Sequence, residues 1–322
     1  MRYLGERDLL AVGIDWPATV AAIGAAARIV SAGDFAQPIK PYLRYGDARN
    51  RIIAMPAFVG GDINAAGIKW IASFPGNFDR GIPRAHSVVI LNLAATGEPH
   101  TIINTPLLSV IRTASVSGLM LQRVREVRGR RPVRVGILGW GPIGQYHARM
   151  CAALLGDDLG TLSVYDPRPI ADGTLDGLAR ETVVARSWQE AYDDADVVIT
   201  CTVAARPYIN RRPKPASLQL NVSLRDYRTE LFPFVRDGIV VDDWDEVCRE
   251  QTDIEMMHKE CGLKRSQTRS LFDVIEDDGW LRSLSSDAVV MFNPMGMAVF
   301  DIAIATHYTR AALHAGVGAV LS

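Results

Sequence analysis

The sequence predicts an α/β protein of two domains, one of which is inserted into the other. Three observations lead to this prediction. In the middle of the chain, short apolar runs alternate with segments of helical pattern. The first 130 residues lack that alternation, and a helical stretch at residues 296–315 follows the middle region. A chain of 322 residues is long enough for about two domains and a large apolar core.

The apolar runs of the middle region are predicted to be parallel β-strands. Most are continuous rather than alternating in hydrophobicity, as expected for strands covered by helices on both faces. Clusters of Gly, Pro and Asp separate them at a spacing that suits strand–helix–strand crossovers. The predicted strands are residues 134–138, 162–165, 182–185, 197–202, 218–222 and 239–241.

The first region predicts a different, α+β arrangement. Its predicted strands are residues 52–55, 67–72, 87–93 and 100–103, with a turn at residues 96–99. An almost wholly apolar helix is predicted from Pro106 to about Val124, and the basic residues 125–131 are interpreted as the domain boundary. We therefore expect one domain of residues 1–125, completed by residues 296–322, and an inserted domain of residues 126–295.

Composition and charge exclude several classes of protein. Hydrophobic residues make up 48% of the chain and charged residues 22%, and the formal net charge is −1. This balance gives no electrostatic reason to expect nucleic acid or an anionic membrane as a partner. Residues 1–6 lack the apolar core of a signal peptide, and the longest apolar run, residues 289–300, is broken by Asn293, Pro294 and Asp301. A cytoplasmic location is therefore expected.

The cysteines do not predict a metal or disulfide framework. Cys151, Cys201, Cys248 and Cys261 form no CxxC pair. His258 together with Cys248 and Cys261 is a weak pattern for zinc, since a stray His and Cys in a charged stretch need no explanation. No metal is expected.

A glycine motif follows the first predicted strand of the middle region. Residues 139–144 read Gly-Trp-Gly-Pro-Ile-Gly, which fits GxGxxG between a strand and a predicted helix of residues 143–155. The first glycine permits a tight turn, the second lets backbone approach a pyrophosphate, and the third lets helix and strand pack closely. The helix N-terminus offers N–H groups to phosphate. The residues of this loop expected to bind a dinucleotide are Gly139, Gly141, Pro142, Ile143 and Gly144.

An acidic residue at the expected distance favours NAD as the cofactor. Asp166 lies 22 residues after Gly144, at the end of the next predicted strand. A carboxylate there accepts hydrogen bonds from the ribose hydroxyls of NAD and repels a 2′-phosphate. Arg168 is placed to serve such a phosphate, which leaves NADP as the alternative. The middle region is thus predicted to be a Rossmann domain, inserted in a discontinuous α+β domain.

Polar residues interrupt the apolar pattern at three places. Lys69 lies in an apolar strand and Arg112 in an apolar helix, where a buried cation needs an anion or a water-lined cavity. Two interpretations are open for each cation. It binds the carboxylate of a ligand, or it is structural and either forms an internal ion pair or extends its stem to solvent. Asp226 follows the strand at 218–222 on the edge where α/β sheets hold ligands. The alternative is an ordinary loop or helix-capping Asp.

Four motifs in order resemble the ornithine cyclodeaminase/mu-crystallin family. They are Gly67-Ile68-Lys69, Arg112-Thr113-Ala114, the glycine loop, and Pro294-Met295-Gly296-Met297-Ala298, and the resemblance covers essentially the whole chain. A closer resemblance is to the branch that forms 2,3-diaminopropionate in staphyloferrin B-type pathways. Residues 37–44, 51–56, 67–71, 199–203, 224–226 and 240–244 carry it.

The resemblance implies a homodimer whose first domain, a substrate-binding/dimerisation domain, holds the substrate. It implies NAD-dependent oxidation of N-(2-amino-2-carboxyethyl)-L-glutamate, with hydride leaving the glutamate Cα and imine hydrolysis to 2-oxoglutarate and L-2,3-diaminopropionate. By position, Lys69 and Arg112 hold the carboxylate next to the reacting carbon. Thr113 and Thr202 are expected to contact the cofactor. A PLP-dependent, cysteine-synthase-like enzyme is expected to make the substrate.

Two departures from the cyclodeaminases favour the diaminopropionate branch. Cyclodeaminases carry an acid in a GGDxPGK-like loop, whereas residues 221–226 read Asn-Val-Ser-Leu-Arg-Asp here, so Asp226 is a displaced candidate for the base. Lys40, Arg44 and Arg51 compete for the upstream carboxylate-binding position, and we favour Arg44 and Arg51. The alternatives are an ornithine cyclodeaminase, an alanine dehydrogenase, a ketimine reductase, or a crystallin-like binding protein. The sequence leaves open whether a siderophore or an antibiotic receives the product, and how residues 245–285 are arranged.

Overall fold

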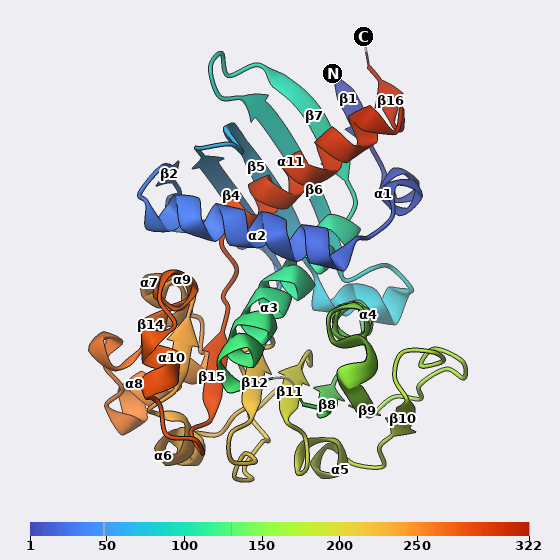
Figure 1. Ribbon diagram of the computed structural model, residues 1–322. Helices are drawn as coiled ribbons and strands as arrows, with labels where there is room; N and C mark the ends of the chain where they lie inside the picture. Colours follow the sequence, from blue (N-terminus) through green and yellow to red (C-terminus); the bar gives the residue numbers. More distant parts are fainter. Residues whose placement is uncertain (48, 130, 322) are drawn as a thin grey trace. The chain divides into compact units, whose positions relative to one another are not determined.

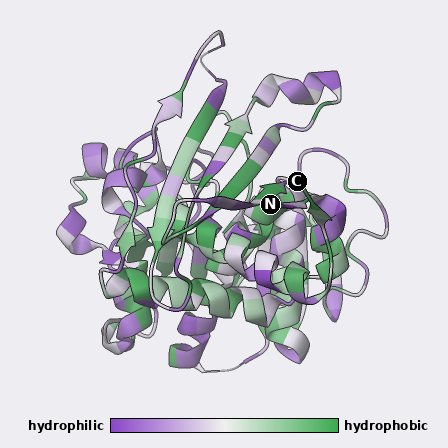
Figure 2. Ribbon diagram, turned by 90° about the horizontal axis from the view of Figure 1, so that it is seen from above, coloured by the Kyte–Doolittle hydropathy of each residue, from purple (hydrophilic) through white to green (hydrophobic). Residues whose placement is uncertain are grey.

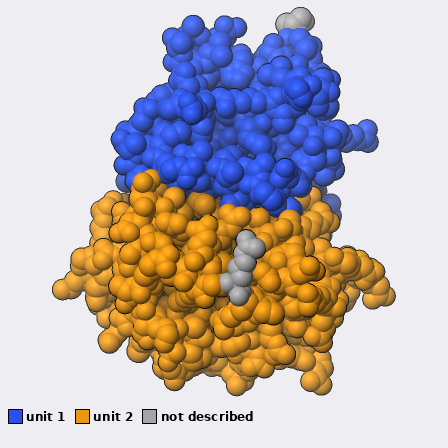
Figure 3. Space-filling model, in the orientation of Figure 1, with its two compact units in different colours: residues 1–115, 296–322 blue, residues 116–295 orange. Residues whose placement is uncertain are grey.

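The computed structural model describes residues 1–47, 49–129 and 131–321. The chain divides into two compact units: unit 1 is Met1–Ser115 with Gly296–Ser322, and unit 2 is Val116–Met295 (Figure 3). The sequence placed the boundary at residues 125/126 instead, because its basic stretch resembles a linker. The division by contacts falls inside helix α3 (Leu107–Arg128), which is continuous through that point. Arg130, part of the expected linker, lies outside the described residues.

Unit 1 is built on a mixed sheet, sheet A, of order β16-β1-β7-β6-β5-β4-β2, with β3 paired to β4 (Figure 1). The long strands β4 to β7 are antiparallel and correspond to the strands predicted in the first region. Gly97 makes the turn between β6 and β7 at φ +75°, and its N–H donates to the Leu93 carbonyl. The strands are β1 (Arg2–Leu4), β2 (Phe35–Ala36), β3 (Tyr42–Leu43), β4 (Arg51–Val59), β5 (Ala65–Ser73), β6 (Ala85–Leu93), β7 (Pro99–Asn104) and β16 (Ala319–Val320).

Helices α2 (Trp16–Ser31) and α11 (Ala298–His314) lie on one face of sheet A (Figure 1). Helix α2 begins at a favourable cap, since the Asp15 carboxylate accepts the Ala18 N–H at 2.9 Å. This helix was not predicted from the sequence, whereas α11 matches the helical stretch expected at residues 296–315. Hydrophobic residues run along the long strands of the sheet (Figure 2). Unit 1 also contains α1 (Glu6–Val12), the 3-10 turn η1 (Pro75–Arg80) and the first part of α3.

Unit 2 is built on a parallel sheet, sheet B, of order β10-β9-β8-β11-β12-β15-β13-β14. Its central strands are buried, as the continuous apolar runs predicted. The strands are β8 (Val133–Leu138), β9 (Leu159–Tyr165), β10 (Glu181–Val184), β11 (Val197–Thr200), β12 (Leu218–Asn221), β13 (Ile239–Val241), β14 (Arg269–Ser270) and β15 (Val290–Asn293). The helices of this unit include α4 (Pro142–Leu155), α5 (Trp188–Tyr192), α6 (Phe232–Val235), α7 (Trp244–Val247), α8 (Asp253–Cys261), α9 (Leu271–Glu276) and α10 (Gly279–Ser283).

Strand order in sheet B reverses between β8 and β11. Strands β9 and β10 lie on one side of β8, and β11 and β12 lie on the other. Ligands of open α/β sheets bind at such a switch point, beyond the carboxyl ends of the strands. The loops after β8, β9, β11 and β12 are therefore the ones that position a site.

In the described part of the chain, no single helix is long and apolar enough to cross a membrane. A bent pair, Glu6–Val12 with Trp16–Ser31, meets the test by length and composition alone.

Candidate active site

The glycine loop connects β8 to α4 in a conformation that requires its first glycine. Gly139 has φ +101°, and a Cβ there would lie 2.6 Å from the Cys201 carbonyl oxygen, which belongs to the chain leaving β11. The loop is fixed on both sides by backbone hydrogen bonds, from Gly139 N–H to the Tyr165 carbonyl at 2.8 Å and from Cys201 N–H to the Leu138 carbonyl at 2.7 Å. The tight turn lies at the switch point, as the motif predicts.

The other two glycines of the loop differ in what surrounds them. A Cβ on Gly144 would lie 2.1 Å from the Gly139 carbonyl oxygen, so this glycine is required for close packing of helix and turn. Nothing lies within 4 Å of a Cβ built on Gly141, which is the N-cap of α4 with Pro142 in the first turn. Open space in front of a helix N-terminus suits a pyrophosphate, which binds to free N–H groups there. The residues present therefore fit a dinucleotide.

Asp166 follows β9 and is joined to the glycine loop. Its Oδ2 accepts the Trp140 N–H at 2.8 Å, and its Oδ1 and Oδ2 accept the Arg168 Nε and Nη2 at 3.0 and 3.1 Å. Burial raises the pKa of Asp166, but the hydrogen bonds from Arg168 and Trp140 outweigh it, so the pKa lies below its ordinary value. Asp166 is therefore an anion at neutral pH, placed beside the loop. The predicted ribose-binding carboxylate, Asp166, is thus paired with Arg168, the cation that left NADP as an alternative cofactor.

Asp226 lies beyond the carboxyl end of β12 and is 1% exposed. Its Oδ1 accepts the Thr202 hydroxyl at 2.6 Å and its Oδ2 accepts the Ser223 hydroxyl at 2.5 Å. Burial raises the pKa of Asp226, opposed by these hydroxyls and by Arg225. The structure thus brings together two residues that the sequence singled out separately, Asp226 and Thr202. A carboxyl with a raised pKa is suited to exchanging a proton.

Lys69 and Arg112 meet on a buried carboxylate. Lys69 Nζ lies 2.7 Å from Asp301 Oδ2, and Arg112 Nε lies 2.9 Å from Asp301 Oδ1. Lys69 comes from β5, Arg112 from α3 and Asp301 from the first turn of α11, and their exposures are 2%, 7% and 0%. Of the two interpretations left open, the internal ion pair is present. It compensates one of two positive charges.

Unused donors remain in this cluster. Within the described residues, Arg112 donates to the protein from Nε, to Asp301, and forms no hydrogen bond from Nη1 or Nη2. A Cβ on Gly296 would lie 2.8 Å from Nη1, so a glycine with φ +87° leaves room beside the guanidinium. The pair Nη1 and Nη2 matches a carboxylate in a bidentate geometry. A ligand anion would supply the second negative charge.

The electrostatics of the cluster agree with this arrangement. Burial lowers the pKa of Lys69 to about 7, opposed by Asp301 and assisted by Arg112 and Lys40. Burial raises the pKa of Asp301, but Arg112 and Lys69 outweigh it, so the pKa lies below its ordinary value. An ammonium with a pKa near neutrality has lost more stabilisation from water than its single carboxylate partner restores. A second carboxylate beside Lys69 would favour its protonated form.

The three candidates for the upstream carboxylate-binding position differ in burial and in the groups they contact. Lys40 is 4% exposed and donates from Nζ to the Gly296 carbonyl at 2.8 Å, so it belongs with the cluster. Arg44 is exposed and Arg51 half-buried, and their guanidinium carbons lie 5.3 and 5.7 Å from the centre of the Tyr42 ring. The sequence favoured Arg44 and Arg51, whereas burial and charge favour Lys40.

Asp301 was not predicted to be a site residue and was noted only as the residue that ends an apolar run. A carboxylate in the apolar residues 298–305 is nevertheless the same signal that singled out Lys69 and Arg112. Its role depends on these two partners, which precede it by 232 and 189 positions in the sequence, so no local pattern shows it. Thr113, expected at the cofactor, donates its hydroxyl to the Ser109 carbonyl at 2.7 Å.

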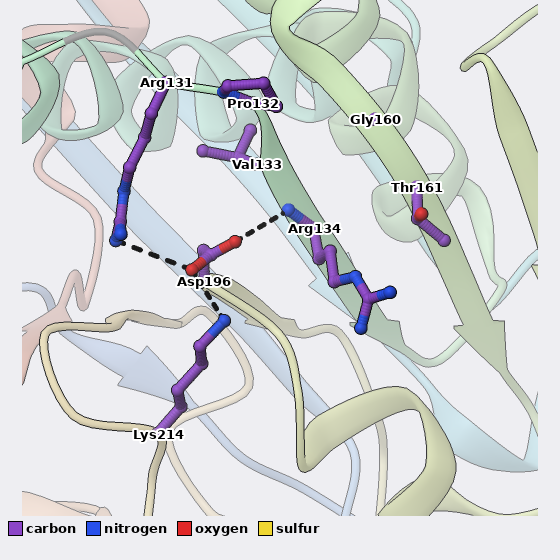
Figure 4. Close-up of a pocket in the computed structure, with 8 residues that line it drawn as sticks. All are labelled: Arg131, Pro132, Val133, Arg134, Gly160, Thr161, Asp196 and Lys214. Carbon is purple, nitrogen blue, oxygen red and sulfur yellow. Dashed lines mark hydrogen bonds and ion pairs between the residues drawn. The ribbon is translucent and has the colours of Figure 1, made fainter.

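A pocket of about 420 Å³ lies at the other edge of sheet B, where β8 and β9 begin (Figure 4). Arg131, Arg134 and Lys214 surround Asp196, which accepts the Lys214 ammonium at 2.8 Å and the Arg134 backbone N–H at 2.9 Å. The glycine loop follows the opposite end of β8, so this pocket is separate from it. Among the described residues, no group of three or more His, Cys, Asp or Glu is arranged to hold a metal ion.

Comparisons with known proteins show which family the chain belongs to. A sequence model of the ornithine cyclodeaminase/mu-crystallin family matches residues 14–314. N-((2S)-2-amino-2-carboxyethyl)-L-glutamate dehydrogenase of Staphylococcus aureus is 31% identical over 100% of this chain and 98% of its own. The chain belongs to the ornithine cyclodeaminase/mu-crystallin family. The predicted family and the predicted oxidoreductase class are therefore confirmed.

Solved structures confirm the predicted α/β fold. Δ1-pyrroline-2-carboxylate reductase of Thermococcus litoralis, in complex with NADH and L-proline, superposes with a TM-score of 0.86 at 20% identity over 100% of both chains. An archaeal alanine dehydrogenase dimer with bound NAD gives a TM-score of 0.82 at 21% identity, over 100% of this chain and 99% of that one. Both structures contain the cofactor that the sequence predicts for this chain.

Proposed function

We propose that this chain is an NAD-dependent dehydrogenase that oxidises N-(2-amino-2-carboxyethyl)-L-glutamate. The observation that carries the proposal is the cluster of Lys69, Arg112 and Asp301, which holds two buried cations on one carboxylate. A substrate carboxylate fits both the uncompensated charge and the unused Nη1 and Nη2 donors of Arg112. The full-length identity of 31% to the dehydrogenase from S. aureus supports this substrate over others of the family.

The cofactor is NAD, held by unit 2. The α4 N-terminus and the open space at Gly141 hold the pyrophosphate, and Asp166 holds the adenosine ribose once Arg168 turns aside. When bound, NAD accepts the hydride that leaves the glutamate Cα. The carboxylate of Asp166 opposes a 2′-phosphate, which supports NAD over NADP.

The residues of the chain supply positioning and proton transfer. Lys69 and Arg112 grip the carboxylate on the reacting carbon and fix the direction of its Cα–H bond. Loss of hydride from Cα converts the secondary amine to an imine, and water adds to the imine carbon. Asp226 takes the proton from that water, after which the C–N bond breaks. One substrate, one NAD and one water give 2-oxoglutarate, L-2,3-diaminopropionate, NADH and one proton.

The homodimer expected from the sequence is also proposed, with sheet A as the interface. The face of sheet A that packs on α11 is buried at Met55, Lys69 and Val89. Side chains of the opposite face are half-buried or exposed within unit 1, and Trp70 is 43% exposed. Pro56, Ile68, Ile90 and Ile102 form an apolar row across that face, one residue from each of β4 to β7. An apolar sheet face of this kind is covered in most soluble proteins, and a second copy supplies a matching surface.

The PLP-dependent enzyme that would supply the substrate stays a prediction.

The experiment is a stoichiometry measurement with purified protein, NAD and N-(2-amino-2-carboxyethyl)-L-glutamate. We expect one NADH, one 2-oxoglutarate and one L-2,3-diaminopropionate per substrate, and no proline from ornithine. Lys69→Ala and Arg112→Ala should lower kcat/KM by about 10²-fold or more while NAD binding persists. Arg49→Ala, which removes an exposed cation of unit 1, is the matched control. Proline formed from ornithine without net NADH would overturn the assignment, and inertness with every amino-acid substrate would favour a binding protein.

A further inference from the structure

The turn that carries Asp226 is held in a strained conformation. Leu224 has φ +65°, a left-handed value that a leucine rarely adopts. The segment ahead of α8 is strained in the same way, with φ +64° at Glu250 and +59° at Gln251. Such conformations are unfavourable for residues other than glycine and persist where surrounding contacts fix them. The two strained segments are joined to each other, since Arg225 donates to the Glu250 carbonyl at 2.9 Å.

Asp253, the first residue of α8, makes most of the other contacts between these segments. Its N–H donates to the Leu224 carbonyl at 2.7 Å. Its Oδ2 accepts the backbone N–H groups of Asp226 and Tyr227 at 3.2 and 3.3 Å. The same oxygen accepts the Asn221 amide at 2.9 Å. Asp253 therefore fixes the backbone on both sides of Asp226, and it does so at 1% exposure.

Asn221 extends the network to β11 and β15. Its Oδ1 accepts the Thr200 hydroxyl and the Leu224 N–H, each at 3.1 Å. Its Nδ2 also donates to Oδ1 of the Asn293 side chain at 2.8 Å. All the hydrogen-bonding capacity of this buried amide is used. The carboxylate of Asp253 is thus held by a rigid frame rather than by a loop.

We propose that Asp253 is a positioning residue for Asp226, which fixes the turn carrying that carboxylate. The inference rests on the proposed acid–base role of Asp226. Removing the acceptor oxygen of Asp253 should lower turnover, and a substitution that keeps an acceptor oxygen there should retain it. These two effects separate positioning from a merely structural role.

Among the described residues, the charged and titratable groups that interact with Asp226 are Arg225, Tyr208, Tyr227, Cys201 and Asp253. Burial raises the pKa values of Tyr208, Tyr227 and Cys201 above their ordinary values, so these groups remain neutral at working pH. Burial raises the pKa of Asp253 to about 7, opposed by the Asn221 and Tyr227 contacts and assisted by Asp226. Arg225 stays charged. Within the described residues of this set, Asp253 is the neighbour whose charge changes near neutrality, and the Asp226 charge contributes to its raised pKa.

Asp253→Asn keeps an acceptor oxygen for the turn and removes the charge. Burial, and not Asp253, raises the pKa of Asp226, so Asp253→Asn should leave the acid limb of the kcat/KM profile in place and retain most of the native turnover. Asp253→Ala removes the acceptor as well, and kcat should fall about tenfold or more, with NAD binding retained and with most of the loss absent in Asp253→Asn. Glu260→Gln is the matched control, because it removes an exposed charge from the same helix. Its profile should match the native one.

A titration by ¹³C NMR with aspartate labelled at the carboxyl carbon tests the pair without turnover. Asp226→Asn and Asp253→Asn assign the two signals, and Asp226→Asn should lower the midpoint of Asp253, because the Asp226 charge raises the pKa of that carboxyl. Native kcat in Asp253→Ala, or an equal loss of kcat in Asp253→Asn and Asp253→Ala, with turnover lost in Asp226→Asn, would overturn this inference and leave the proposed function standing. Native turnover in Asp226→Asn would instead overturn the proposed role of Asp226.

Discussion

Asp301 accepts hydrogen bonds from two cations on separate elements, Lys69 on β5 and Arg112 on α3. Asp301→Asn keeps the shape of the side chain and removes the negative charge, so two buried cations would face each other unpaired. Breaking a buried ion pair costs about 3–5 kcal/mol, and we expect a loss of that order in the free energy of unfolding by urea. Asp47→Asn, which removes an exposed partner of Arg49, should unfold at the native urea concentration. Equal midpoints for all three proteins would contradict the buried pairing.

Lys69 gives the site a pH dependence on the alkaline side. Its pKa of about 7 means that the ammonium loses its proton as the pH rises through neutrality. A bound carboxylate favours the protonated form, so binding takes up a proton and affinity should fall as the pH rises, approaching about tenfold per pH unit. The measurement is the KM for substrate, or the affinity for 2-oxoglutarate, across neutral pH. Lys69→Met should bind weakly without this trend. Constant native affinity would contradict a role for Lys69 in carboxylate binding.

At the same scale, the sequence located part of the candidate site. Lys69 and Arg112 could be found because a cation in an apolar pattern is visible in one short segment. Asp301 carries the same signal, but its meaning depends on partners in two other elements. The choice among Lys40, Arg44 and Arg51 depended on burial, which neighbouring polar residues do not reveal.

The glycine loop offers a prediction at the scale of one element. Gly144→Ala forces a Cβ against the Gly139 carbonyl and should lower the melting temperature by about 5 °C or more. Gly141→Ala meets nothing within 4 Å, so the melting temperature should be kept while NAD affinity falls about tenfold or more. Gly76→Ala is a control in similarly open space outside the loop. Native NAD affinity in Gly141→Ala would contradict the loop as the pyrophosphate site.

Elements with a clear period could be predicted, and others could not. The strands β8 to β13 appear where the apolar runs predicted them. Strand β15 was hidden in a single apolar run with the start of α11, which Asn293 and Pro294 divide. The order of the strands in sheet B could not be predicted either. Strand β15 lies between β12 and β13, although β13 and β14 both precede it in the sequence. Such pairings depend on the whole sheet rather than on any segment.

At the scale of the whole molecule, the apolar row on sheet A predicts the oligomeric state. Ile68→Glu places a charge in the middle of that row and should convert a dimer to a monomer. Leu10→Glu is the matched control, because Leu10 is 51% exposed on α1, outside the row. Analytical ultracentrifugation measures the mass of each protein. A native monomer, or an Ile68→Glu variant that stays dimeric, would contradict the proposed interface.

The strand order has a consequence for folding during synthesis. Strand β15 pairs with both β12 and β13, so both of these strands keep an unpaired edge until residues 290–293 leave the ribosome. Unit 1 waits in the same way, because its sheet is covered by α11 and Lys69 has no Asp301 before residues 298–314 are made. Open strand edges and uncovered apolar faces are the features that make nascent chains aggregate. Both units therefore become complete at nearly the same moment, once residues 290–314 have been made, and expression should depend on chaperones that protect the growing chain.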